Sequence, residues 1–160
     1  MEITKDTVFI HYGDVFDIEK FNEIKNATIP WIKPNGGYWA SPVESKKGWK
    51  DWCLKENFLC FGDWYKDIDK HQKFTIAEDA KILYLRNEEE IAILRETYQS
   101  KDTHLLCLGI YPDFEKIVAD GYQAIYYEDN METHHPLLCW DCDSLLVMDP
   151  TIINVIKEEN

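Results

Sequence analysis

The C-terminal third of the chain contains a C-x-x-C pair, Cys139 and Cys142, with His134 and His135 shortly before it. Thiolates and imidazoles are ligands that zinc prefers, so this segment is a candidate metal site. The same pair is also the pattern of a thioredoxin-like redox motif, although no strand-to-helix setting accompanies it. Because all four side chains lie within nine residues and no second C-x-x-C occurs, we favour plain buried thiols over both alternatives.

The familiar catalytic motifs are absent from the sequence. Gly36 and Gly37 lack the third glycine of a dinucleotide-binding turn, and no Lys-Ser or Lys-Thr of a P-loop follows them. There is no G-x-S-x-G, no H-E-x-x-H and no EF-hand loop. An ordered set of other polar and aromatic residues remains: His11 in an apolar segment, an aromatic segment with a serine over 38–41, and a polar cluster over 141–144.

Four segments of the chain together resemble the ADP-ribosyltransferase-like fold, in its His-Tyr-acidic subclass. They are FIHYG at 9–13, GYWAS at 37–41 with GW at 48–49, DFEKIVADGY at 113–122, and DSLLVMDP at 143–150. They span nearly the whole chain. The resemblance implies a protein that binds NAD as a substrate and transfers ADP-ribose to a macromolecule, with a protein as the expected acceptor. A small transferase of this kind suits a toxin, an effector or a modifier encoded by a phage or bacterium.

The resemblance implies a role for each candidate binding residue. His11 would bond a ribose hydroxyl on the adenosine side of NAD. Tyr38 and Trp49 would lie on either side of the nicotinamide ring, and Ser41 would line the same wall. Breaking the bond between nicotinamide and ribose produces an oxocarbenium-like sugar, which a nearby acidic group stabilises. Taken without the resemblance, a tryptophan is more often part of the core than of a ligand wall, so we assign Trp52 to the core.

The acidic position departs from the family pattern, because aligning the last strand places Ser144 there. The adjacent Asp143 would point to the opposite face of a regular strand, unless a bulge turned it inward. We predict a catalytic role for Asp143 first and for Glu128, at the end of the preceding strand, second. Asp141 is a further alternative, and Ser144 is expected to contribute less. If no carboxylate serves, the alternative is a catalytically inactive acidic interaction or inhibitor module on the same fold.

A mixture of strands and helices must position these residues. Short β-prone segments predict strands over 8–12, 38–41, 74–76, 81–85, 123–127 and 144–148. The spacing of apolar residues predicts helices over 17–24, 45–58, 88–98 and 114–119. Proline and glycine predict a loop over 29–37. Strands and helices do not alternate strictly, which favours an α+β fold. The resemblance implies one compact domain over 1–160 with a mixed, mostly antiparallel split sheet.

Composition narrows the function classes. The chain has 160 residues, of which 45% are hydrophobic, and its 17 Lys and Arg against 30 Asp and Glu give a net charge of −13. The length suits one domain with a real core. The negative charge repels phosphate backbones and anionic lipid surfaces, so we expect neither nucleic acid nor membrane partners. The start lacks the pattern of a signal peptide and the 5 cysteines form no regular framework, which predicts a cytoplasmic protein with reduced thiols.

Overall fold

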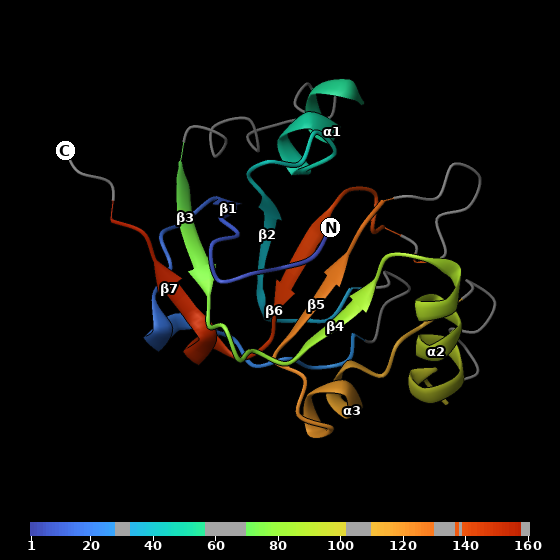
Figure 1. Ribbon diagram of the computed structural model, residues 1–160. Helices are drawn as coiled ribbons and strands as arrows, with labels where there is room; N and C mark the ends of the chain where they lie inside the picture. The colour runs from blue at the N-terminus through green and yellow to red at the C-terminus, as the bar shows by residue number, and fades with distance from the viewer. Residues whose placement is uncertain (28–32, 57–69, 102–109, 130–136, 138, 158–160) are drawn as a thin grey trace.

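The computed structural model describes residues 1–27, 33–56, 70–101, 110–129, 137 and 139–157. Seven strands in these residues form one sheet in the order β4-β5-β6-β2-β1-β3-β7 (Figure 1). The strands are β1 (Phe9–Tyr12), β2 (Tyr38–Pro42), β3 (His71–Ile76), β4 (Ile82–Leu85), β5 (Ala124–Tyr127), β6 (Ser144–Val147) and β7 (Ile153–Val155). β4 and β5 are parallel, and the other neighbouring pairs are antiparallel. The predicted α+β fold with a mixed, mostly antiparallel sheet is confirmed.

Three α-helices accompany the sheet in the described residues: α1 (Trp49–Lys55), α2 (Glu88–Tyr98) and α3 (Phe114–Ala119). α2 and α3 have the predicted bounds because side chains cap them: Asn87 accepts a hydrogen bond from the Glu90 backbone N–H, and Asp113 accepts one from that of Lys116. α1 begins at Trp49, later than predicted. Across the described ranges, no helix is long and apolar enough to cross a bilayer.

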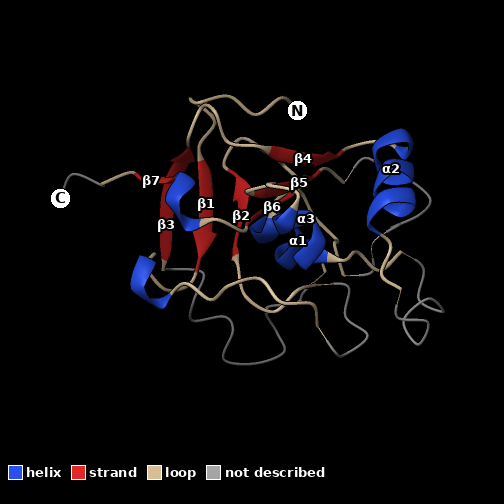
Figure 2. Cartoon of the chain, turned by 90° about the horizontal axis from the view of Figure 1, so that it is seen from below, coloured by secondary structure: helices blue, strands red, loops and turns tan. Residues whose placement is uncertain are grey.

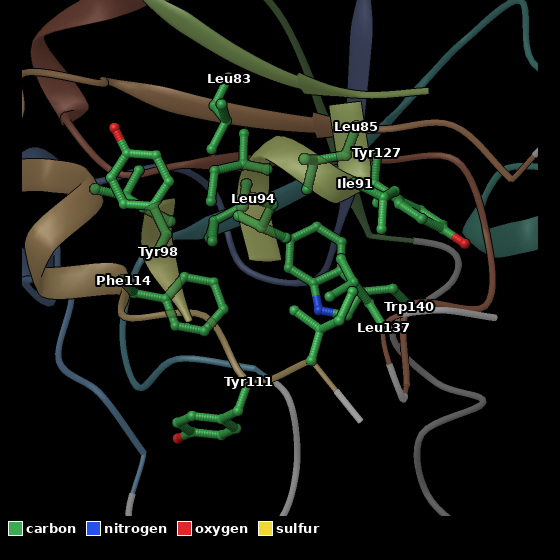
Figure 3. Packing of buried hydrophobic residues seen from close by; sticks show 14 of the residues in the cluster. Leu83, Leu85, Ile91, Leu94, Tyr98, Tyr111, Phe114, Tyr127, Leu137 and Trp140 are labelled. Atoms are coloured by element: carbon green, nitrogen blue, oxygen red, sulfur yellow. The ribbon is translucent and has the colours of Figure 1, made fainter. Parts of the chain in front are cut away.

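The two faces of the sheet pack against different parts of the chain. On one face, buried side chains of α2 and α3, such as Leu94 and Phe114, meet Leu85 and Tyr127 of the sheet (Figure 3). On the other face, a second apolar cluster includes Phe9, and Ile3 of the N-terminal segment packs against it. Figure 2 shows α1 and α3 on one side of the sheet and the N-terminal segment on the other. β5 is buried along its whole length because both faces are covered.

The structure corrects one predicted element and adds one strand that was not predicted. The predicted helix over 17–24 is only a 3-10 helix at Ile18–Lys20, because residue 21 returns to an extended backbone and Lys25 pairs with Asn35 in an isolated bridge. The strand β7 was not predicted, since its three residues carry too short a pattern. The other predicted strands and the helix predicted over 45–58 appear with shifts at their ends, and residues 57–58 of that helix lie outside the described residues.

Candidate functional site

A cavity of about 290 Å³ lies where β1, β2, the start of α1 and residues 139–144 meet. Its described lining consists of Ile10, His11, Tyr12, Lys33, Trp39, Ala40, Ser41, Trp49, Cys139, Asp141, Cys142 and Ser144. Four of the predicted site residues are in this lining: His11, Ser41, Trp49 and Ser144. Cavities that bind small molecules typically measure about 300–1,000 Å³, so this one suits part of a dinucleotide rather than the whole.

The cavity begins where β1 and β2 stop pairing. β1 pairs with β2 only at Phe9 and Ile10, whereas it pairs with β3 along all four of its residues. Beyond Ile10, the side chain of His11 contacts β2 instead of the backbone, with its Nδ1 2.6 Å from the carbonyl oxygen of Trp39. A side chain thus replaces a backbone ladder bond, and the two strands part around it.

The state of His11 follows from this contact. A carbonyl oxygen can only accept a hydrogen bond, so Nδ1 donates and carries the proton. Burial lowers the pKa of His11 below its ordinary value, more than the Trp39 bond and Asp14 raise it, and this favours a neutral ring. Nε2 is then an acceptor. A Cβ at Gly13 would lie 3.0 Å from Nε2, so the glycine keeps that side of the ring accessible.

Tyr38 lies on the other side of the strand from the cavity. Its ring stacks on His11 with centroids 4.1 Å apart, and Phe16 meets it edge-on at 5.3 Å. Tyr38 lines a separate hollow of about 600 Å³, which shares His11 with the cavity. Burial raises the pKa of Tyr38 well above its ordinary value, and its buried hydroxyl has no hydrogen-bond partner among the described residues. The structure therefore does not bring Tyr38 and Trp49 to opposite sides of one slot.

Ser41 and Trp49 are joined directly. The Oγ of Ser41, which is buried, accepts a hydrogen bond of 2.9 Å from the backbone N–H of Trp49. That N–H is the first of α1, where the preceding Gly48 provides no side-chain cap. Ser41 thus fixes the start of the helix against β2 and sets the position of the Trp49 ring. Trp49 in turn stacks on Trp52, with centroids 5.2 Å apart.

The predicted acidic residues lie in two different settings. Asp143 is buried, outside the cavity lining, and accepts hydrogen bonds from the Ser45 hydroxyl at 2.5 Å and the Asp129 backbone N–H at 2.7 Å. Burial raises the pKa of Asp143, more than these hydrogen bonds lower it. Glu128 is also outside the lining and pairs with the N-terminal amine of Met1. Among the described residues, Asp141 is the carboxylate that lines the cavity.

Ser144 lines the cavity beside the C-x-x-C pair. Its hydroxyl donates to the Cys142 carbonyl oxygen at 2.9 Å. Burial raises the pKa of both Cys139 and Cys142, which favours uncharged thiols at neutral pH. The described residues contain no group of three or more His, Cys, Asp or Glu able to hold a metal. His134 and His135 lie outside the described residues, so the zinc hypothesis stays a prediction.

Several residues of the cavity, among them Lys33 and Trp39, were not predicted from the sequence. Lys33 was not considered, and its Nζ lies over the ring of Trp39, 5.0 Å from the centroid, and 6.0 Å from that of Trp49. No binding role was predicted for Trp39. The alternation of a strand does contain the signal, because Trp39 and Ser41 are two residues apart and must share a face, whereas Tyr38 must point the other way. No local pattern in the loop before β2 could have located Lys33.

Comparison with known proteins gives no match of this chain to a protein-family model, a curated protein or a solved structure.

Proposed function

We propose that the chain binds NAD and transfers its ADP-ribose group to a protein acceptor, as an ADP-ribosyltransferase-like protein. The observation that carries the proposal is the parting of β1 and β2 around His11, beside a cavity lined by two indoles, three hydroxyl groups and one carboxylate. This set matches what the cleavage of nicotinamide from ribose requires: a flat apolar face, hydrogen-bonding groups for the sugar, and a negative charge near the reacting carbon.

The residues present fit the two halves of NAD. The cavity accommodates the nicotinamide and its ribose, with a ribose hydroxyl donating to Nε2 of His11. The hollow on the other side of His11 accommodates the adenosine half. Its wall includes the Tyr38 ring, and the buried Tyr38 hydroxyl gains a hydrogen-bond partner from the bound molecule. In this arrangement Tyr38 contacts NAD, but at a different place from the predicted nicotinamide sandwich.

The carboxylate best placed for catalysis is Asp141, because it lines the cavity and the Asp143 carboxylate is occupied by Ser45 and Asp129. The bond between the nicotinamide nitrogen and C1′ of the ribose breaks, and its electron pair leaves with nicotinamide, which becomes neutral. C1′ gains positive character, which Asp141 stabilises. A nucleophile of the acceptor protein then bonds to C1′ and loses its proton to solvent.

A second candidate is a catalytically inactive interaction module that retains the cavity. The burial of Asp143 and the pairing of Glu128 with the N-terminus favour it, because they place both of these carboxylates outside the cavity lining. The net charge of −13 would then direct the module toward a basic partner. The two candidates differ in whether nicotinamide is released.

The test is incubation of the protein with labelled NAD and cell lysate, followed by measurement of free nicotinamide and of ADP-ribose on protein. Asp141→Asn is expected to reduce nicotinamide release by about 10²–10³ while NAD still binds. Asp143→Asn is the matched variant on the same segment, and per folded molecule it should remain active. No binding of NAD at millimolar concentration by calorimetry would refute the proposal. NAD binding without nicotinamide release in any condition would favour the inactive module.

A further inference from the structure

Two indole rings of the cavity lie close to the same positive charge. The ammonium group of Lys33 lies over the Trp39 ring and also within 6.0 Å of the Trp49 centroid. An aromatic face attracts a cation through its quadrupole, and tryptophan does so best. None of the described carboxylates forms an ion pair with Lys33. The lysine is therefore held by the two indoles rather than by an acidic partner.

Each of these indoles packs against a second tryptophan. Trp39 meets the fully buried Trp140 edge-on, with centroids 4.8 Å apart, and Trp49 stacks on Trp52. The backbone of Trp49 is also fixed by its hydrogen bond to Ser41. Rigid walls of this kind bind a ligand without the cost of ordering side chains. Both indoles line the cavity, so the site is accessible from it.

The charges of the cavity favour a positively charged ligand. Among its described lining residues, Asp141 is the acidic group and Lys33 the only lysine or arginine. Both act on the same thiol: Asp141 raises the pKa of Cys139 and Lys33 lowers it, beside the larger effect of burial. Moving Lys33 away would leave two aromatic faces and one carboxylate, a combination that attracts cations and repels anions.

We infer that Trp39 and Trp49 form a binding site for a flat organic cation, for which the side chain of Lys33 is an internal competitor. The expected ligand class is an aromatic ring with a quaternary nitrogen. The nicotinamide ring of oxidised NAD belongs to this class and that of reduced NAD does not, and to that extent the inference rests on the proposed function. Lys33 then makes the site selective, because only a ligand with its own positive charge recovers the interaction that the lysine gives up.

The test uses two small probes, 1-methylnicotinamide, which is a cation, and nicotinamide, which is neutral, each titrated by calorimetry into the full chain. Lys33→Met removes the internal cation and keeps an unbranched side chain, so 1-methylnicotinamide should bind about 2- to 10-fold more tightly than to the wild type. Lys33→Arg keeps a cation and should leave the affinity within about twofold. Nicotinamide should bind more weakly than 1-methylnicotinamide to every variant.

Trp39→Leu and Trp49→Leu should each weaken the binding of 1-methylnicotinamide, and either variant suffices if the other fails to fold. Equal binding of the two probes, no binding of 1-methylnicotinamide, or weaker binding in Lys33→Met would overturn the inference. The last result would instead assign Lys33 to an anionic ligand, which parallel titration with ADP-ribose would reveal. The outcome is separable from the proposed function, because 1-methylnicotinamide contains neither the ADP-ribose group nor a bond that the transferase would break.

Discussion

The hydroxyl of Ser45 donates to the carboxylate of Asp143 at 2.5 Å, joining the turn before α1 to the start of β6 across 98 positions of sequence. The same carboxylate accepts from the Asp129 backbone, and the Asp143 backbone N–H donates to the carbonyl oxygen of Lys47. One buried residue therefore joins its own segment to two others, the turn over 45–47 and the chain at Asp129. This arrangement assigns Asp143 a structural role that is independent of catalysis.

Asp143→Ala is expected to lower the free energy of unfolding by about 1–3 kcal/mol, because the Ser45 hydroxyl and the Asp129 N–H lose their acceptor. Asp141→Ala should change it by no more than about 0.5 kcal/mol, as at a partly exposed site without a described hydrogen bond of its side chain. Urea unfolding of both variants measures the difference. Equal losses would contradict the assignment of Asp143 as the structural carboxylate of this segment.

The stability of the protein should depend on pH through His11. Burial lowers the pKa of His11 from its ordinary 6.5, so the unfolded chain binds a proton more readily than the folded one. The contribution to stability is fully present above pH 6.5 and is lost as pH falls through the lower pKa of the folded state. Relative to His11→Gln, which does not titrate, the wild type should lose stability progressively as pH falls below about 6.5. Parallel profiles of unfolding free energy against pH would show that burial of His11 is not linked to folding.

Ser41→Ala should loosen the start of α1, because the first N–H of the helix loses its acceptor. A loss of about 0.5–1.5 kcal/mol in unfolding free energy is expected, together with faster hydrogen exchange at the Trp49 amide. Ser144→Ala is a matched control, since it also removes a buried hydroxyl, whose bonds within the described part of the chain go to residue 142. If both variants exchange equally fast at Trp49, Ser41 does not fix the helix.

Gly36→Ala should destabilise the turn that leads into β2 more than Gly121→Ala destabilises its own turn. Both glycines have left-handed φ values, +83° and +86°, which an alanine adopts at a cost of about 1–2 kcal/mol. At Gly36 a Cβ would also lie 2.2 Å from the Glu23 carbonyl oxygen, whereas at Gly121 the nearest atom is 3.9 Å away. Thermal unfolding should therefore separate the two variants. Equal melting temperatures would mean that the backbone at Glu23 moves away from the added Cβ without a loss of stability.

Local patterns predicted the elements whose determinants are themselves local. α2 follows from the Asn87 cap and the spacing of Ile91 and Leu94, all within one stretch of sequence. The 3-10 helix at Ile18–Lys20 was overestimated because a distant contact, the pairing of Lys25 with Asn35, pulls the following chain into an extended form. Strand order and the parting of β1 from β2 depend on such distant contacts and were not derivable from periodicity.

In the candidate site, too, some residues could be predicted from the sequence and others depend on contacts made only in the folded chain. His11, Ser41, Trp49 and Ser144 were selected by their order in the sequence, and the structure brings them to one cavity. Lys33 was missed because its place over two indoles is fixed only by the folded loop. The burial of Asp143 could not be predicted either, since its acceptor role depends on Ser45, 98 positions away along the chain, and on the backbone of Asp129, 14 positions away.

The short strand β7 affects how the molecule behaves toward other copies of itself. It ends one side of the sheet, and an outermost strand presents unpaired backbone groups to which a strand of another chain can add. β7 has only three residues, and the positively charged Lys157 stands two residues beyond it. Such a short edge strand, with a charge close to its end, offers few backbone groups to which an added strand could hydrogen-bond. This protects this side of the sheet from aggregation.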